Sequence, residues 1–315
     1  MSTFLLLLEY TLIFSSVLML VALGGCYSEH SGVINIGLEG IMVMGALGGA
    51  LVMNIFPGLS PVMMILAVMA GSMLCGVLYS TLLGFSAIHL KADQTIIGTA
   101  MNMLAIALAT IIVKSINMAG NASNPTSILQ YIEQKKAFIV KIGTFEFNWF
   151  MLIAIIILII GYIVMYKTRF GLRLQACGEF PQAAASVGID VYKMRWAGVL
   201  ISGLLGGLGG LVYIIAGVSE WKFENGVAGF GFLAMAVMIF GQYRPLRIGV
   251  SALLFGFFRA LGNVYTGFNF LVALNIPSTI YNMLPYIVCL LVLTFTSKNS
   301  RAPKADGIPY EKGQR

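Results

Sequence analysis

The sequence contains few charged side chains. Of its 315 residues, 10% are Asp, Glu, Lys or Arg, and 59% are hydrophobic. Soluble domains carry roughly 25% charged and about 45–50% apolar residues, because their surface must be hydrated. This composition argues against a soluble enzyme, a disordered protein and a nucleic-acid-binding protein. We therefore expect most of the chain to lie in lipid.

The chain also lacks the motifs of several chemistries. It contains no GxxxxGK[ST] phosphate loop, no Ser/His/Asp arrangement, only two histidines, and no CxxC pair among its four cysteines. Hydrolysis of ATP by the phosphate-loop route is therefore excluded, and scattered cysteines are more typical of small apolar side chains than of metal ligands. We expect no enzymatic activity, no cofactor and no metal site in this chain.

Long apolar runs make up most of the sequence. A helix needs about 20 apolar residues to cross a hydrocarbon core of roughly 30 Å. Separated at Gly, Pro and charged residues, the runs predict an all-α, polytopic transmembrane bundle of about nine spans, within a range of eight to ten. The expected spans are Phe4–Leu23, Val33–Ile55, Val62–Phe85, Thr95–Ile116, Trp149–Tyr166, Trp196–Gly217, Ala228–Gln242, Ile248–Tyr265 and Ile280–Phe295.

Two of these spans look irregular. Val33–Ile55 is interrupted by five glycines, and Ala228–Gln242 is short. Broken or re-entrant helices are allowed in a membrane only where protein or a water-filled cavity covers the freed backbone. We expect residues 1–297 to form a single transmembrane domain and residues 298–315 to form a cytoplasmic tail without fixed structure.

The positive charges predict an orientation. If the basic segment Lys167–Arg195 is cytoplasmic, thirteen Lys and Arg residues fall on the inner side and four on the outer side. Such a bias follows the positive-inside rule. The C-terminus is then cytoplasmic and, with nine spans, the N-terminus is extracellular.

Polar residues within the second span are candidates for function. Glu39 in hydrocarbon costs at least a few kcal/mol unless it faces water or a partner. Asn35 lies four residues earlier, so both would share one helix face. Two interpretations stay open, namely a polar patch on the translocation path and a structural hydrogen-bonding pair. We also expect Asn102 and Asn282 near the pore, and we expect Arg259 to face protein rather than lipid.

The basic segment around residues 167–195 contains a second candidate. Pro181 is well placed at a helix start, Gln182–Val187 favours a short helix, and Gly188 is a natural stop. A short helix with an Ala-rich face between two spans suggests docking into a groove on a cytoplasmic partner. A surface helix lying on lipid headgroups is the alternative.

Three segments of the sequence form a recognisable set. They are Asn35-x-Gly37-x-Glu39-Gly40-x-Met42-x-x-Gly45-Ala46, Gly178-Glu179-x-Pro181-x-Ala183-Ala184-x-x-x-Gly188-Ile189 and Gly229-Phe230-Gly231-Phe232-x-Ala234-x-Ala236-Val237. Together they resemble the permease subunits of bacterial ABC importers in the ribose and branched-chain amino acid permease superfamily. The first segment most resembles the nucleoside-importer branch, and the second is similar to the family's ATPase-coupling loop.

The resemblance implies a half-transporter in a bacterial cell membrane. A second permease chain, like or unlike, would complete the pore, and ABC ATPase subunits holding ATP and Mg²⁺ would dock on Gly178–Ile189. An extracellular substrate-binding lipoprotein would deliver nucleosides. A simple sugar such as ribose is an alternative cargo. An ion-coupled secondary transporter is an alternative class, although its intramembrane acids would be few, Glu9 and Glu39.

Overall fold

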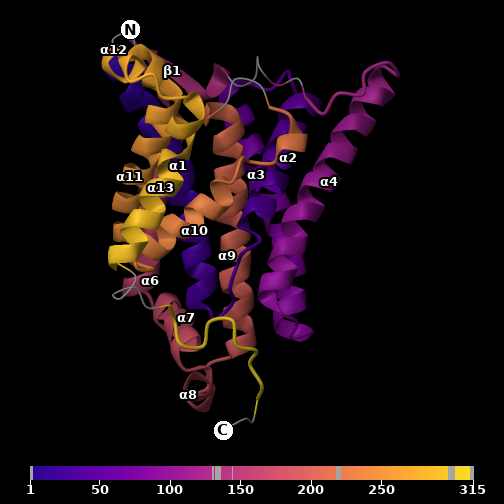
Figure 1. The fold of residues 1–315 in the computed structure, drawn as a ribbon. Helices are drawn as coiled ribbons and strands as arrows, with labels where there is room; N and C mark the ends of the chain where they lie inside the picture. Colours follow the sequence, from indigo (N-terminus) through magenta and orange to yellow (C-terminus); the bar gives the residue numbers. More distant parts are fainter. Residues whose placement is uncertain are drawn as a thin grey trace.

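The computed structural model describes residues 3–129, 131, 136–143, 145–217, 221–296 and 302–312. The chain forms a helical bundle with its two termini at opposite ends (Figure 1). Among the described residues, seven helices are long and apolar enough to cross a membrane, which confirms the predicted polytopic bundle. They are α1 (Thr3–His30), α2 (Leu38–Ile55), α3 (Pro61–Gly84, extended by η1, Phe85–His89), α4 (Gln94–Gly120), α6 (Trp149–Lys167), α9 (Val191–Val212, extended by η3, Tyr213–Gly217) and α11 (Pro245–Val264).

The two remaining predicted spans also form helices. They are α10 (Phe230–Phe240), which is too short to span a membrane, and α13 (Ser278–Thr296), in which a shorter apolar stretch is described. The brevity of α10 agrees with the expectation of broken or re-entrant helices. Its ends are set by Gly229, which has a left-handed φ of 79°, and by Gly241, which follows its last residue.

Small elements cap the two ends of the bundle (Figure 1). One end, the hairpin end, holds the antiparallel strands β1 and β2, paired from Ile139↔Asn148 to Ile142↔Phe145, and α12. The other end, the α7–α8 end, holds α7, α8 and the C-terminal segment. The bounds of the remaining short elements, in chain order, are η2 (Lys136–Phe138), β1 (Ile139–Ile142), β2 (Phe145–Asn148), α7 (Arg169–Glu179), α8 (Pro181–Ser186), η4 (Phe223–Asn225), η5 (Tyr265–Gly267) and α12 (Asn269–Ala273).

The centre of the bundle is built by α1, α2 and α9, and α3 packs closely on α2 and α9 through small residues. A Cβ atom added to Gly45 of α2 would lie 2.2 Å from the Cα atom of Gly207 on α9. Backbones can approach this closely only where side chains are minimal. The glycine-rich stretch of α9 is therefore a helix-packing surface.

The start of α2 differs from the sequence prediction. We expected a span from Val33, but the helix begins at Leu38. The helix α1 continues to His30, and the chain then turns through Gly32, which has a φ of 89°. Residues 31–37 are thus a non-helical connection rather than the first turns of a span.

Candidate functional site

The non-helical connection before α2 is a break whose backbone groups are satisfied partly by the end of α1 and partly by side chains of α4. The Ile34 N–H donates to Oε1 of Gln94 (2.7 Å). Asn102 bridges the break, because its Nδ2 donates to the carbonyl of Ile36 (3.0 Å) and its Oδ1 accepts from the Gly40 N–H (2.8 Å). Buried backbone groups without such partners are costly, so these amides are what allow the break.

Glu39 joins the beginnings of two helices. Its Oε1 accepts from the Gly229 N–H (2.8 Å), and its Oε2 accepts from the Gly231 N–H (2.7 Å). A carboxylate at this place satisfies the free N–H groups of α10 and complements the positive end of the helix dipole. A Cβ atom on Gly231 would lie 2.4 Å from the Glu39 nitrogen, so the two helix starts meet at backbone distance.

Asn35 lies outside the helix that contains Glu39, so the prediction that both share one helix face is wrong. Its Nδ2 donates to Oγ of Ser202 on α9 (2.8 Å). Its Oδ1 is buried and has no hydrogen-bond partner in the described part of the chain. Asn35 lies within the break and Glu39 and Asn102 lie beside it, and each of the three is hydrogen-bonded to another segment.

Asn282 lies elsewhere. It is exposed on α13 beside Gly262 of α11, and a Cβ atom on that glycine would be 3.2 Å from its Oδ1. The residue of α13 that contacts the start of α10 is Tyr286, one turn after Asn282. Its hydroxyl donates to the carbonyl of Ala228, just before α10 (3.4 Å). The residues around Tyr286 in the sequence do not predict this contact, because its partner lies 58 positions earlier in the chain.

An aromatic and cationic cluster adjoins the start of α10. The Phe230 ring packs against those of Tyr213 (4.8 Å between centroids) and Phe14 (5.6 Å). The Arg259 guanidinium lies 5.4 Å from the Phe230 centroid and 6.0 Å from that of Phe14. The prediction that Arg259 faces protein is therefore confirmed. Sequence reasoning could not assemble this cluster, because its members come from four separate segments.

The second candidate region, the predicted ATPase-coupling segment, forms two short helices at the α7–α8 end. The start of α8 is Pro181, as predicted, and Gly188 follows it with a φ of 85°. The preceding helix α7 was not predicted. It begins after Thr168, whose Oγ1 accepts from the Gly171 N–H (3.2 Å). The segment is thus more helical than expected.

The faces of α8 are divided between core and solvent. Pro181 and Ala184 are buried, and Ala184 joins a small core with Cys177 of α7. Ala183 is exposed, and Val187, just after the helix, is 75% exposed. The surface that a partner could reach is therefore the Ala183–Val187 side, not the whole Ala-rich stretch. Of the other predicted coupling residues, Gly178 is buried and Ile189 is half-buried. Glu179 and Gly188 are exposed.

The described part of the C-terminal tail packs onto this region, whereas the sequence suggested a tail without fixed structure. The Ala305 N–H donates to the carbonyl of Gly178 (2.8 Å), and the buried Arg195 donates to the carbonyl of Ile308 (2.9 Å). Tyr310 is buried beside Tyr192, with 5.3 Å between ring centroids. These hydrogen bonds, together with the packing of Tyr310 against Cys177, Ala184 and Val191, hold the tail on α7, α8 and α9.

The tail also forms a buried pair of carboxyl groups. The side chain of Asp306 is hydrogen-bonded to that of Glu29, at the end of α1. Burial raises the pKa of Asp306 to about 7, while the Glu29 hydrogen bond and nearby Arg195 act in the opposite direction. A shared proton is the simplest way for two acids to lie together in such a site.

The bundle, with two helix starts that meet inside it, defines the class of this protein as a multi-pass helical membrane protein. The family described as "Branched-chain amino acid transport system / permease component" matches residues 7–293, and the chain belongs to that family. Its members are permease components of transporters, so the chain is a transport subunit rather than an enzyme itself.

Relatives cover nearly the whole chain. It is 39% identical to the guanosine ABC transporter permease protein NupQ of Bacillus subtilis, over 97% of this chain and 96% of the relative. It is 37% identical to the nucleoside ABC transporter permease protein NupC of Lactococcus lactis, over 96% of both. It is 26% identical to NupB, a second nucleoside ABC transporter permease protein of Lactococcus lactis, over 76% of this chain and 67% of the relative.

Proposed function

We propose that this chain is one permease subunit of an ABC importer that carries nucleosides across the cell membrane. The observation that carries the proposal is the similarity to guanosine and nucleoside permeases along nearly the entire chain.

The proposed assembly has a second, unlike permease chain. In Lactococcus lactis, one nucleoside permease protein is 37% identical to this chain and another is 26% identical. This difference supports a pore built from two diverged chains. ATPase subunits that hold ATP and Mg²⁺ would dock at the α7–α8 end, and a substrate-binding lipoprotein would deliver cargo at the hairpin end.

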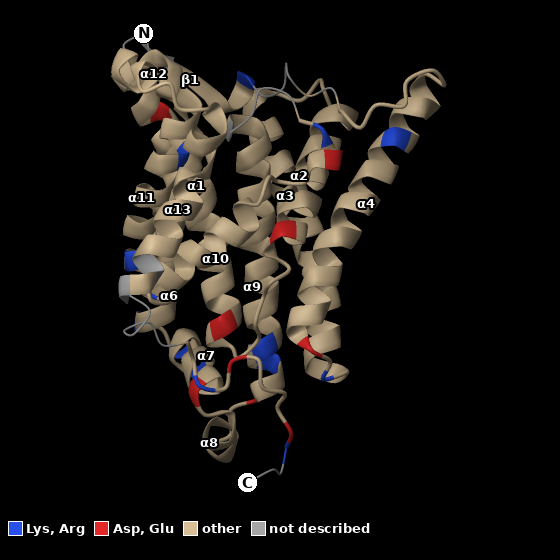
Figure 2. Cartoon of the chain, viewed as in Figure 1, with Lys and Arg blue, Asp and Glu red and all other residues tan. Residues whose placement is uncertain are grey.

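The proposed orientation places the α7–α8 end in the cytoplasm. Figure 2 shows many basic residues around α7 and near the tail. At this end of the bundle Arg169 and Arg173 of α7, Lys193 of α9 and Arg244 before α11 are exposed. A cytoplasmic excess of Lys and Arg is what the positive-inside rule describes. The C-terminus is then cytoplasmic and the N-terminus extracellular.

Uptake of radiolabelled guanosine and ribose tests the cargo. In a strain without other nucleoside importers, deletion of this gene should abolish guanosine uptake, and the gene supplied on a plasmid should restore it. Ribose uptake should stay unchanged. Loss of ribose uptake with normal guanosine uptake would refute the nucleoside assignment and identify the chain as a sugar permease.

The same assay distinguishes an ABC importer from an ion-coupled transporter. Both carboxylate oxygens of Glu39 already accept backbone N–H groups, which disfavours a role in ion coupling. Uptake should stop when the partner ATPase is deleted. Uptake that persists without the ATPase but collapses with a protonophore would instead establish the ion-coupled class.

The docking surface on α8 has its own test. Ala183→Asp places a charge on the exposed side without entering the core, whereas a charge at the buried Ala184 would disrupt packing. Ala183→Asp should leave the protein in the membrane but reduce substrate-stimulated ATPase activity of the reconstituted complex at least tenfold. Thr95→Asp, at an exposed position in the first turn of α4, is the matched control and should have no effect. Normal stimulation in Ala183→Asp would refute docking on this side.

A further inference from the structure

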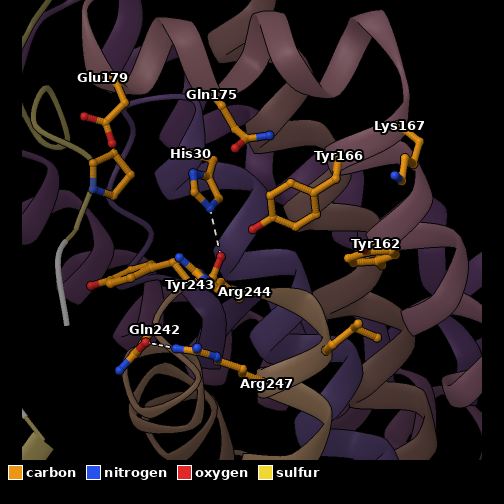
Figure 3. Close-up of a pocket in the computed structure, with 12 residues that line it drawn as sticks. His30, Tyr162, Tyr166, Lys167, Gln175, Glu179, Gln242, Tyr243, Arg244 and Arg247 are labelled. Atoms are coloured by element: carbon orange, nitrogen blue, oxygen red, sulfur yellow. Dashed lines mark hydrogen bonds between the residues drawn. The ribbon is translucent and has the colours of Figure 1, made fainter. Parts of the chain in front are cut away.

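A cavity of about 810 Å³ lies at the α7–α8 end of the bundle. Its walls come from the ends of α1 and α6, from α7, from the turn between α10 and α11, and from Pro303 of the C-terminal tail (Figure 3). Polar side chains dominate the part that Figure 3 labels, including two tyrosines of α6, Tyr162 and Tyr166. Glu179 also belongs to the proposed ATPase-coupling segment, and the other lining residues have no role in the proposed transport mechanism.

The cavity is positively charged. Lys167, Arg244 and Arg247 line it, and Glu179 is its single lining acid. Figure 3 shows Glu179 at the opposite edge from Lys167. The three cations take part in none of the ion pairs formed among the described residues, and Arg247 donates to Oε1 of Gln242. Cations left without counter-ions around a hollow favour an anionic ligand.

The turn that presents two of these cations is held in place. Gln242 and Tyr243 have left-handed φ angles of 54° and 56°, which are unusual for residues with a Cβ atom. The carbonyl of Tyr243 accepts from Nε2 of His30 (2.9 Å) and from Sγ of Cys26 (3.2 Å), both on α1. This anchoring fixes the direction in which the chain enters α11.

The beginning of α11 adds to the positive field. Arg244 is its N-cap residue and makes no side-chain cap, and Pro245 has no N–H group. The free N–H groups of the first turn therefore carry partial positive charge at the wall of the cavity. An oxyanion there would meet the arginines and the end of the helix together.

Apolar surface continues from the cavity along the outside of the bundle. Leu246 lines the cavity and is 50% exposed, and Val250, one turn further along α11, is 69% exposed. Ile163 is exposed on the neighbouring α6, which packs against α11 where Gly249 meets Leu158. A small soluble anion would gain nothing from this surface, whereas an acyl chain would be buried on it.

We propose that the cavity binds the phosphate headgroup of an anionic phospholipid from the leaflet at the α7–α8 end. Arg244, Arg247 and Lys167 contact the phosphate, the tyrosine hydroxyls of α6 donate hydrogen bonds to it, and the acyl chains lie along α6 and α11. The lipid thereby links α6 to the turn that enters α11.

Native mass spectrometry of the full-length protein in detergent tests this proposal. Phosphatidylglycerol and phosphatidylcholine with identical acyl chains are added in turn, and the bound fraction of each is measured. The wild-type protein should retain phosphatidylglycerol preferentially. Near a membrane surface each Lys or Arg contributes about fivefold in affinity, so Arg244→Gln/Arg247→Gln should weaken phosphatidylglycerol binding by about 25-fold.

The matched control removes two cations from the same end of the protein. Arg169 and Arg173 are exposed on α7 and do not line the cavity, so Arg169→Gln/Arg173→Gln should bind phosphatidylglycerol like the wild type. Thermal melting of both variants verifies that each is folded.

Three outcomes would overturn the proposal. The first is equal retention of the two lipids by the wild-type protein, and the second is an equal loss of binding in both double variants. The third is displacement of bound phosphatidylglycerol by millimolar inorganic phosphate, which would assign the cavity to a soluble phosphate instead of a lipid.

Discussion

Removal of the Glu39 carboxylate is the sharpest test of the junction between α2 and α10. In Glu39→Ala, the N–H groups of Gly229 and Gly231 lose the acceptors that now lie 2.8 and 2.7 Å away. A buried hydrogen bond to a charged group is worth about 1.5–3 kcal/mol. The loss of two predicts a destabilisation of about 3–6 kcal/mol, centred on the start of α10.

Glu39→Gln removes the negative charge of the side chain but keeps its shape, so it separates the two contributions to stability. The amide keeps one oxygen as an acceptor, but its NH₂ group then faces an N–H donor. We therefore expect about half of the destabilisation, roughly 1.5–3 kcal/mol. This order of stability, wild type above Glu39→Gln above Glu39→Ala, is specific to a carboxylate that accepts two backbone hydrogen bonds.

Thermal unfolding of the purified protein in detergent micelles, measured together with nucleoside uptake in cells, checks this order. Glu9→Gln is the matched control, because Glu9 is also a buried acid in an apolar helix but its backbone hydrogen bond, from Glu146, is long at 3.5 Å. It should change the stability by less than about 1 kcal/mol. A Glu39→Ala protein with wild-type melting and uptake, or a Glu9→Gln protein equally impaired, would refute the reasoning.

Three further predictions follow from packing and protonation. Asn102→Leu leaves two backbone groups at the α2 break unpaired and should lower stability by about 2–4 kcal/mol in thermal unfolding. Gly45→Ala drives a methyl group into the backbone of α9 and should reduce the folded yield, measured by size-exclusion chromatography. Gly49→Ala meets only the end of a leucine side chain and should be milder, so equal yields would contradict this packing argument. The docked tail holds the proton of Asp306 up to about pH 7, whereas a free aspartate releases it near its ordinary pKa of 3.8, so docking should weaken as pH rises from about 4 to about 7. Hydrogen exchange of residues 302–312 measures this, and Asp306→Asn should flatten the pH dependence unless Glu29 alone produces it.

Local features of the sequence predicted several parts of the structure. The apolar runs located the helices, because transfer of side chains into lipid adds up along each segment. Pro181 and Gly188 correctly bounded α8, since one fixes φ and the other tolerates a left-handed conformation. Arg259 was placed toward protein because an unpaired cation in lipid is costly.

Other features of the structure could not be predicted from neighbouring residues in the sequence, because they depend on partners far away in the chain. The true start of α2 depends on Gln94 and Asn102, which supply hydrogen bonds from a different helix and so permit residues 31–37 to leave the helical conformation. The tail carries a polar, charged composition, and only the fold brings Cys177, Ala184 and Val191 of α7, α8 and α9 together so that Tyr310 is buried against them.

The sequence by itself determined that this protein is a helical membrane permease, roughly where its spans lie and which end is basic. Only the tertiary structure decided what the polar residues in those spans do. Glu39 caps a helix that begins about 190 residues later in the chain, and Asp306 meets Glu29 from the opposite terminus. Hydrophobic transfer depends on neighbouring residues, whereas a buried polar group is satisfied by whichever partner the fold brings within hydrogen-bonding distance.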